Sequence, residues 1–348
     1  MPRVKIFYAV KSAISPEIIK AIDKHVHGYD IASLGEFQLL SRNGVSSDRL
    51  LFSNPVKDPR HIKITSRHGV NWYSFDSDAE IDKLAEHAPQ GNVYLRLLVS
   101  DQGSKFPLSR KFGIEPAYAV EFAQKAVNKG LNVRGLTFHV GSQSVNPESW
   151  ENAISLCGDL IKKLKKVGCE IDTINIGGGF PARYDSSHVE LKIIAKTINK
   201  SLNKYIPKNV EVFAEPGRYI SAESALLVSS IIGHENRAGS KWLFLDMGVF
   251  QGLIEPLEMP GIKFPVISTK LNNPSELVSY TLTGPTCDAC DTIGDDYKLP
   301  ENLTVGDKIC LLSTGAYTDV YESSFNGFKP PKKYYIQSDR EFKDVLKK

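Results

Sequence analysis

The amino-acid sequence predicts an α/β protein with two parts: an eight-stranded (β/α)8 barrel over residues 1–221 and a mostly antiparallel β domain over residues 222–348. In the first part, short apolar segments alternate eight times with amphipathic helical segments, which is typical of a parallel sheet closed into a barrel. In the second part, Gly, Pro, Asn and Asp separate the apolar segments and few helical periods intervene. That pattern favours antiparallel strands joined by turns.

The first predicted strand is Lys5–Val10, an apolar run rich in β-branched and aromatic residues. A helix is expected over Ser15–His25, with Pro16 and Glu17 in its first turn. Lys11 therefore stands where a parallel strand ends and its helix begins, which is the edge where α/β barrels hold their chemistry. Because a single lysine is usually a solvated loop charge, its role depends on what stands at the other strand ends.

The rest of the barrel follows the same alternation. The further predicted strands are Tyr29–Ala32, Leu50–Phe52, Trp72–Phe75, Val93–Leu98, Gly135–Val140, Thr173–Ile176 and Glu211–Ala214. The predicted helices between them are Leu34–Arg42, Pro59–His68, Asp78–His87, Tyr118–Lys129, Pro147–Val167 and Val189–Tyr205.

The predicted β domain begins after about Ser221, although the last barrel helix can also include Ser221–Val228. Turn-forming residues bound each of its apolar runs. The predicted strands are Leu226–Ile232, Trp242–Leu245, Phe264–Ile267, Val278–Leu282, Lys308–Leu312 and Lys332–Ile336.

Polar side chains and glycines stand at the ends of several barrel strands. Because the carboxyl ends of the strands meet at one rim, these residues are expected to converge. The glycines after strands seven and eight occupy the places where barrels bind phosphate, since glycine lets backbone N–H groups approach an anion. The predicted rim residues are Lys11, Asp30, Arg96, His139, Ser142, Gly178, Gly179, Glu215, Gly217 and Arg218.

A lysine, a phosphate site and an acid on one rim suit pyridoxal 5′-phosphate. Lys11 would bond covalently to the cofactor, and Glu215 would keep the ring nitrogen protonated. A protonated ring is a strong electron sink, so the acid favours decarboxylation over simple proton exchange. His139 is expected to stack on the ring. The structural alternatives are a rim salt bridge for Glu215 and a satisfied core histidine for His139.

Several motifs carry a resemblance to a known family. The barrel motifs are Tyr8-Ala9-Val10-Lys11, His139-Val140-Gly141-Ser142, Gly177-Gly178-Gly179-Phe180 and Glu215-Pro216-Gly217-Arg218. The motifs of the second part are Gly284–Asp291, Gly315-Ala316-Tyr317-Thr318 and Phe325-Asn326-Gly327-Phe328. With these motifs, the chain resembles the pyridoxal-phosphate-dependent ornithine/lysine decarboxylases of the alanine racemase fold, in the family's order and over nearly its whole length.

The resemblance implies roles for these residues. In the barrel, Lys11, His139 and Glu215 act on the cofactor ring, while Asp30 and Arg96 line its pocket, with Glu36 as a further candidate. The phosphate would be held by Ser142, Gly179, Gly217, Arg218 and Tyr317, and Gly178 is a further cofactor-binding residue.

The resemblance also implies roles for the second part of the chain. Cys287 would return a proton to Cα after CO2 leaves, Asp288 would bind the distal ammonium of the substrate, and Phe325 would shape the pocket. A thiol near a cationic site can have a lowered pKa, which suits proton transfer. The Cys287-x-x-Cys290 spacing also matches half of a zinc site, but it lacks a second ligand pair, so no metal is predicted.

The family forms head-to-tail homodimers whose active sites straddle the interface. The resemblance therefore implies that Cys287 and Asp288 serve the partner's barrel. It also implies that Lys111 and Asp291 pair across the interface.

The substrate implied by the resemblance is a basic L-amino acid. L-Ornithine, or alternatively L-lysine, would yield putrescine or cadaverine and CO2. Glu255, with Glu258 as the alternative, is the candidate second acid for the distal ammonium. The same-fold alternatives are a diaminopimelate or arginine decarboxylase, although Asp288-Ala289-Cys290 departs from the Glu-Ser-Gly usual in diaminopimelate decarboxylases. A non-catalytic regulatory homologue is the alternative of another class.

The composition limits the partners. The formal net charge is +3 with acids and bases interspersed, which gives no support for nucleic-acid binding. The five cysteines are irregularly spaced, which favours a reducing, cytoplasmic setting over a disulfide framework. No apolar run is long enough to cross a bilayer, so no membrane association is predicted.

Overall fold

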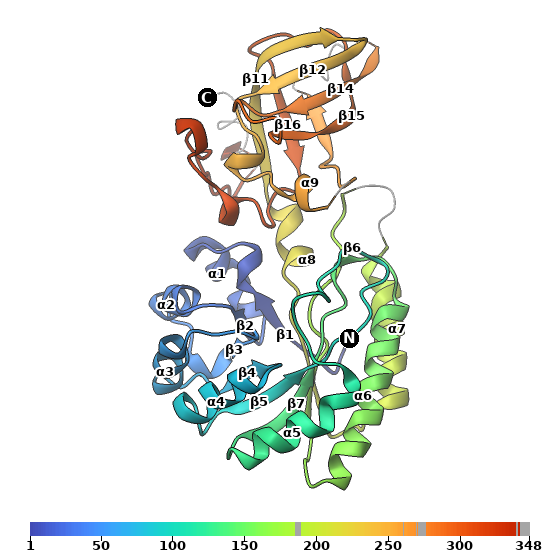
Figure 1. The fold of residues 1–348 in the computed structure, drawn as a ribbon. Helices are drawn as coiled ribbons and strands as arrows, with labels where there is room; N and C mark the ends of the chain where they lie inside the picture. The colour runs from blue at the N-terminus through green and yellow to red at the C-terminus, as the bar shows by residue number, and fades with distance from the viewer. Residues whose placement is uncertain (185–188, 260, 269, 271–275, 339, 342–348) are drawn as a thin grey trace. The chain divides into compact units, whose positions relative to one another are not determined.

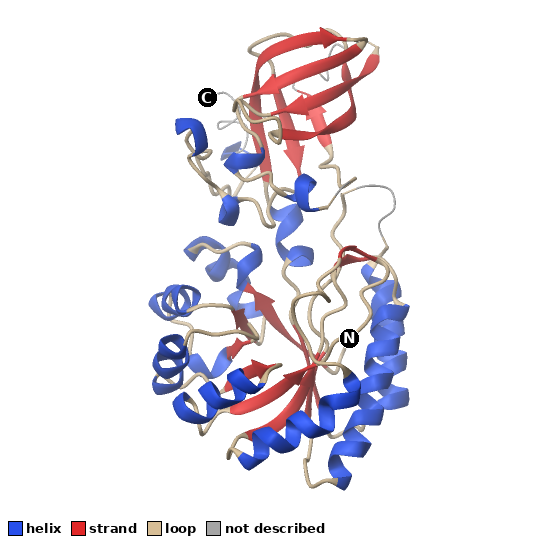
Figure 2. Ribbon diagram, in the orientation of Figure 1, coloured by secondary structure: helices blue, strands red, loops and turns tan. Residues whose placement is uncertain are grey.

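The computed structural model describes residues 1–184, 189–259, 261–268, 270, 276–338 and 340–341. The chain divides into two compact units, Met1–Ala225 and Leu226–Lys348. The first is an α/β barrel and the second is built on a β-sheet (Figure 1, Figure 2). The fold class predicted from the sequence is therefore confirmed.

Eight parallel strands close the barrel in the order β1-β10-β9-β7-β5-β4-β3-β2. All eight predicted strands are present. Their bounds are β1 Val4–Ala9, β2 Gly28–Ile31, β3 Leu50–Phe52, β4 Trp72–Phe75, β5 Asn92–Arg96, β7 Asn132–Thr137, β9 Thr173–Asn175 and β10 Glu211–Ala214. A short ribbon of β6 (Ser104–Phe106) and β8 (Ser142–Ser144), which the sequence did not predict, lies beside them.

Helices surround the strands of the barrel (Figure 1). Hydroxyl caps start several of them: Ser15, Ser33 and Ser77 each accept a backbone N–H of the first turn. The predicted helix Ser15–His25 is an α-helix that ends at Ile22, followed by a 3₁₀ turn. The helices are α1 Pro16–Ile22, α2 Leu34–Arg42, α3 Pro59–Arg67, α4 Asp78–His87, α5 Ala119–Asn128, α6 Glu148–Lys166, α7 Leu191–Tyr205 and α8 Arg218–Ser221.

The inside of the barrel has an apolar layer followed by a polar layer. Phe7, Leu51 and Phe213 form a buried cluster of their own, with the rings of Phe7 and Phe213 4.8 Å apart. Two residues further along the chain, on the same face, Leu51 is followed by Ser53 and Phe213 by Glu215. The apolar layer therefore supports a set of buried polar side chains at the carboxyl ends of the strands.

The second unit is a six-stranded sheet of order β13-β16-β11-β12-β14-β15, in which every neighbouring pair except β12 and β14 is antiparallel. Its small helix is α9 (Glu255–Glu258). The strands are β11 Leu226–Arg237, β12 Ser240–Leu245, β13 Val266–Ser268, β14 Leu277–Thr283, β15 Thr292–Pro300 and β16 Lys308–Leu312.

One prediction about this unit is wrong, and one strand of the unit was not predicted. The apolar run Lys332–Ile336 is not a strand, and its side chains are exposed. Thr292–Pro300 is a strand although it contains Gly294, Asp295 and Asp296, which have low strand propensity. Its pairing with β14 outweighs that propensity, because strand stability comes mainly from the neighbouring strand.

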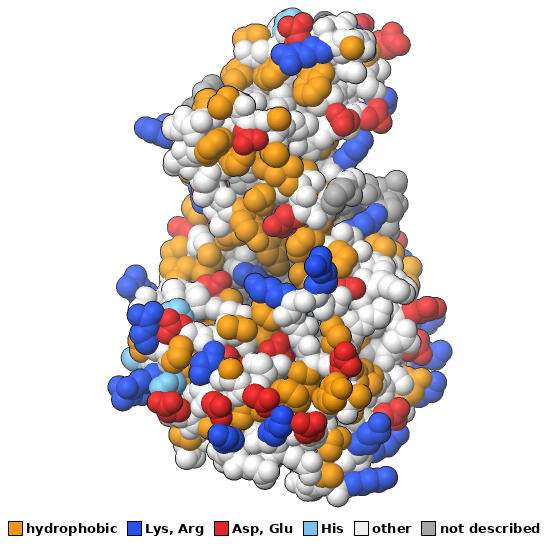
Figure 3. Space-filling model, in the orientation of Figure 1, with side chains coloured by type: hydrophobic (Ala, Val, Ile, Leu, Met, Phe, Trp, Pro, Cys, Tyr) orange, Lys and Arg blue, Asp and Glu red, His pale blue; other side chains and the backbone are white. Residues whose placement is uncertain are grey.

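None of the described helices is both long and apolar enough to span a bilayer. On the face shown in Figure 3, cationic and anionic side chains are interspersed over the barrel.

Candidate active site

Lys11 lies on a 3₁₀ turn, Val10–Ser12, directly after β1. Its Nζ is 2.9 Å from Oδ2 of Asp30, because the register of β1 and β2 places Ala9 opposite Asp30. The Asp30 side chain is only 3% exposed, whereas that of Lys11 is 46% exposed. The buried carboxylate therefore holds an amine that solvent and ligands can reach.

Glu215 directly follows β10, the other neighbour of β1 in the barrel. Its Oε1 accepts a hydrogen bond from Asn175 Nδ2 at 2.6 Å and another from the Ser53 hydroxyl. Burial, and then the negative charge of Asp30, raise the pKa of Glu215 to about 7, against the opposing effect of Lys11. An acid with this pKa can hold or release a proton near neutral pH.

The glycine loop after β9 comes close to Glu215 and His139. Gly177 and Gly179 have left-handed φ values of 64° and 93°. A Cβ on Gly178 would lie 2.7 Å from the Glu215 carbonyl oxygen and 3.1 Å from His139 Nε2. The loop therefore needs glycine both for its conformation and for the close approach.

Arg218 and Ser142 meet beside this loop. Arg218 begins α8 and is buried; its Nε donates to Ser142 Oγ at 3.2 Å and its guanidinium to the Tyr184 hydroxyl at 2.9 Å. Gly217 precedes it, and a Cβ there would lie 2.9 Å from the Ser12 side chain. A buried cation beside glycine loops is the arrangement that binds a phosphate group.

His139 has a neutral ring. Its Nδ1 accepts the backbone N–H of Gly141 at 3.1 Å. Desolvation, together with the positive charges of Arg96 and Lys11, holds the pKa of His139 well below its usual value. A neutral imidazole can stack on a cationic ring without charge repulsion.

Arg96 and Glu36 complete the barrel side of the site. Arg96 ends β5, with its guanidinium 5.3 Å from the centre of the Phe112 ring, and burial lowers its pKa. Glu36 accepts the Ala32 N–H at 2.6 Å. Burial, and to a lesser degree the charge of Asp30, raise the pKa of Glu36 to about 7. Both side chains thus add charged groups around Lys11 and Asp30.

In the second unit, the Cys287 thiol is exposed and contacts Asn326 Oδ1 at 3.3 Å, while the Cys287 N–H donates to the same oxygen at 3.2 Å. Asn326 follows Phe325, whose ring packs against Phe250 at a centroid distance of 4.5 Å. Cys287 therefore contacts the residue that follows Phe325. Asp288 is exposed and its Oδ1 accepts the Cys290 N–H.

The other predicted residues of this unit lie in distinct surroundings. Tyr317 has a left-handed backbone with φ 54°. Glu255 is buried at the start of α9, whereas Glu258 at its end is exposed. Asp291 is fully buried, and its carboxylate accepts the N–H groups of Val249 and Thr286 at 2.7 and 2.9 Å.

The sequence prediction missed three buried hydrogen-bonding side chains next to Glu215. Ser53 stands directly after β3, the same position that identified the other rim residues, and could have been found by that rule. Asn175 lies at the end of β9, two residues before the first glycine of the loop. Tyr94 lies two residues before Arg96 and so on the same face of β5.

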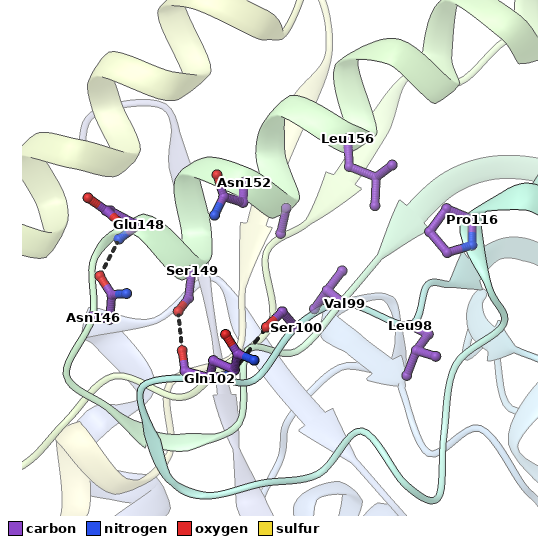
Figure 4. A pocket seen from close by; sticks show the side chains of 11 residues that line it. Leu98, Val99, Ser100, Gln102, Pro116, Asn146, Glu148, Ser149, Asn152 and Leu156 are labelled. Carbon is purple, nitrogen blue, oxygen red and sulfur yellow. Dashed lines mark hydrogen bonds between the residues drawn. The ribbon is translucent and has the colours of Figure 1, made fainter.

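A separate cavity of about 390 Å³ lies between the loop after β5 and the start of α6 (Figure 4). The Ser149 hydroxyl ties these two segments together by donating to the Gln102 carbonyl at 3.0 Å. Leu98 and Leu156 line its apolar part. None of the predicted site residues lines this cavity, so it is distinct from the rim site.

The rim residues fit pyridoxal 5′-phosphate. Asp30 Oδ1 is buried and has no hydrogen-bond partner among the described residues, so a further polar group can be accommodated there. The glycine loop would be filled by a single Cβ, and Arg218 supplies a positive charge for a phosphate. Lys11 supplies the amine that bonds an aldehyde.

Comparisons with known proteins agree with this fit. A family model described as the pyridoxal binding domain of pyridoxal-dependent decarboxylases matches residues 1–222. A lysine/ornithine decarboxylase of Selenomonas ruminantium is 33% identical over 329 residues, which cover 94% of this chain and 82% of that protein. Antizyme inhibitor 2 of Xenopus laevis is 32% identical, with coverage of 99% and 78%.

Solved structures agree in the fold. The crystal structure of the Paramecium bursaria Chlorella virus arginine decarboxylase matches with a TM-score of 0.90 and 30% identity, over 97% of this chain and 90% of that chain. The resemblance stated from the motifs is confirmed. The chain therefore belongs to the family of pyridoxal-phosphate-dependent ornithine/lysine decarboxylases.

Proposed function

We propose that this protein is a pyridoxal-phosphate-dependent decarboxylase of a basic L-amino acid, L-ornithine or L-lysine, which produces CO2 and putrescine or cadaverine. The observation that carries the proposal is the convergence of the Lys11–Asp30 pair and the buried acid Glu215 on adjacent barrel strands. When bound, the cofactor supplies a ring that accepts the electrons of the breaking Cα–carboxyl bond.

The barrel residues have separate tasks in this proposal. Lys11 bonds the cofactor, and Asp30 holds the amine in place at 2.9 Å. Glu215, with a pKa of about 7, shares a proton with the ring nitrogen. His139, held neutral, lies against the ring. The proposed phosphate ligands are Ser142, Gly179, Gly217, Arg218 and Tyr317, and Gly178 is a further cofactor-binding residue.

The second unit would supply the groups that face the substrate. Cys287, whose thiol is exposed, protonates Cα after CO2 leaves, and Asp288 accepts a hydrogen bond from the distal ammonium. Phe325 shapes the pocket, and Glu255 is the second acid. Ornithine and lysine differ by one methylene, which a pocket distinguishes by only ~1–3 kcal/mol.

The direct test is incubation of the purified protein and pyridoxal 5′-phosphate with ornithine, lysine, arginine and diaminopimelate. We expect CO2 and a diamine from ornithine or lysine, and none from the Lys11→Ala variant. Agmatine from arginine would favour the activity named for the viral relative. Absence of product from all four substrates, with the cofactor bound, would favour a regulatory homologue, which the similarity to antizyme inhibitor 2 makes the second candidate.

We further propose a homodimer with shared active sites. Because Lys11 and Cys287 would then act from different chains, mixing the inactive variant Lys11→Ala with the slowed variant Cys287→Ala should restore about a quarter of the wild-type sites. A mixture with no more activity than its Cys287→Ala component alone would contradict the shared site. Asp291 is fully buried in its own unit. The proposed Lys111–Asp291 pair therefore requires that this carboxylate becomes accessible to Lys111 of the other chain.

A further inference from the structure

One oxygen of Glu215 is enclosed by side chains that the proposed reaction does not use. Ser53, Tyr94 and Asn175 come from three different strand segments, after β3, in β5 and at the end of β9. All three are buried. Burying a hydroxyl or an amide costs free energy unless the group is hydrogen-bonded. The arrangement of these three side chains around one carboxylate therefore needs a physical explanation.

The direction of each hydrogen bond follows from which groups carry a proton to donate. Burial, and then the charge of Glu215, raise the pKa of Tyr94 well above 10, so its hydroxyl keeps its proton and donates to Ser53 Oγ. The single proton of Ser53 is then directed to Glu215 Oε1. Asn175 Oδ1 accepts the Gly177 N–H at 2.9 Å, which orients its Nδ2 as the second donor to Oε1.

The second oxygen, Oε2, accepts no hydrogen bond from the described residues. Three charged groups face the carboxylate: Asp30 from β2, Lys11 from the turn after β1 and Arg96 from β5. Asp30 opposes the ionised acid, while Lys11 and Arg96 favour it. Ser53 and Asn175 both donate to Oε1, so these two neutral residues determine how that oxygen is held.

We infer that Ser53, Tyr94 and Asn175 are positioning residues that hold Glu215 by Oε1 and leave Oε2 as the oxygen that serves the cofactor ring nitrogen. This inference rests on the proposed function. The two hydrogen bonds to Oε1 together prevent rotation of the carboxylate. The hydrogen bond from Tyr94 in turn fixes the orientation of the Ser53 hydroxyl. Such supporting hydrogen bonds keep a functional group in its working geometry.

The position of Ser53 is itself fixed. Its carbonyl oxygen accepts the Ser74 hydroxyl at 2.7 Å. The loop that follows is held by the buried ammonium of Lys57, which donates to the carbonyls of Asn54 and Ser74 at 2.9 and 2.6 Å and pairs with Glu80 at 2.7 Å. The backbone that carries the Ser53 side chain therefore cannot move away from Glu215 without breaking several buried hydrogen bonds.

The test measures the Glu215 carboxyl group directly in the full-length, cofactor-free protein. Carbon-13 NMR of labelled glutamate, with Glu215→Gln to assign the signal, gives its pKa. We expect Ser53→Ala and Asn175→Ala each to raise this pKa by about one pH unit, since each removes one hydrogen bond to the ionised form. Ser53→Thr, which keeps a hydroxyl, should return the wild-type value, and Tyr94→Phe should give a smaller rise.

The loaded enzyme provides a second readout. Ser53→Ala should lower kcat about tenfold with KM for the amino acid within about twofold, because the acid acts on the bond-breaking step and not on substrate binding. A Glu215 pKa unchanged in Ser53→Ala and Asn175→Ala would overturn the inference. If one of these two variants does not fold, the Glu215 pKa is measured in the variant that folds and in Tyr94→Phe. An unchanged pKa in both would overturn the inference.

The two proposals fail in different ways. One outcome is that the wild type decarboxylates none of the amino acids while the Glu215 pKa rises as expected in Ser53→Ala and Asn175→Ala. In that case the proposed function is wrong, and the role of the hydrogen bonds to Oε1 is supported. If decarboxylation proceeds normally and the pKa does not move in these variants, the positioning role is wrong and the function stands.

Discussion

The buried carboxyl group of Glu215 should make the cofactor-free protein less stable as the pH rises. Its pKa is about 7 in the folded protein, above the ordinary 4.5. Between these values the folded state binds a proton that the unfolded state has released, so the free energy of unfolding falls with rising pH. The separation, at about 1.4 kcal/mol per pH unit, corresponds to about 3 kcal/mol lost from below pH 4.5 to above pH 7.

Replacing Glu215 by Gln should remove this loss, because a glutamine has no proton to release. The assay is urea unfolding from pH 5 to pH 8, followed by tryptophan fluorescence in a Trp242→Phe background, so that Trp72 and Trp150 report on the barrel. We expect the stability of the variant relative to the wild type to increase across this range by up to about 3 kcal/mol.

Glu36 provides the matched control. Its pKa is also raised to about 7, mainly by burial, so Glu36→Gln should remove part of the pH dependence and leave the part due to Glu215. The double variant should show the weakest dependence of the three. Parallel stability curves for the wild type and Glu215→Gln would refute the reasoning, since they would mean that folding does not change the proton affinity of Glu215.

Three further predictions concern other parts of the site. Gly178→Ala places a Cβ 2.7 Å from the Glu215 carbonyl and should weaken cofactor binding at least about tenfold in an absorbance titration, with an unchanged circular dichroism spectrum. Cys287→Ala should slow turnover and yield a second product, protonated at the wrong carbon; a single product in chromatography would count against the thiol as proton donor. Lys57→Met should cost about 3 kcal/mol in urea unfolding, because it breaks the fully buried pair with Glu80, and Lys57→Met/Glu80→Leu should recover most of it; equal losses in both variants would argue against the pair.

The barrel was predictable because its signals are local. Each strand is a short apolar run, and helices such as Leu34–Arg42 begin one residue after a hydroxyl cap. Chain direction also made the rim predictable, since parallel strands place their carboxyl ends together. That rule alone predicts that Lys11, Asp30 and Glu215 share one candidate site.

Features that depend on a partner strand were not predictable in this way. Thr292–Pro300 has weak strand propensity and forms β15 only because β14 is there to pair with it, while Lys332–Ile336 has the composition of a strand and pairs with none of the described strands. The hydrogen bonds to Glu215 are of the same kind, because Asn175 reaches it from the neighbouring strand β9 and Ser53 from the end of β3, with β1 and β2 in between.

The sequence by itself determined the order of the barrel elements and which residues stand at their ends, because strand runs, caps and glycines act within a few residues. Only the tertiary structure decided the state of those residues: that Asp30 is buried beneath an accessible amine, and that Glu215 is held by one oxygen with a raised pKa. Burial and hydrogen bonding arise from residues far apart in the chain, so they appear only when the barrel closes.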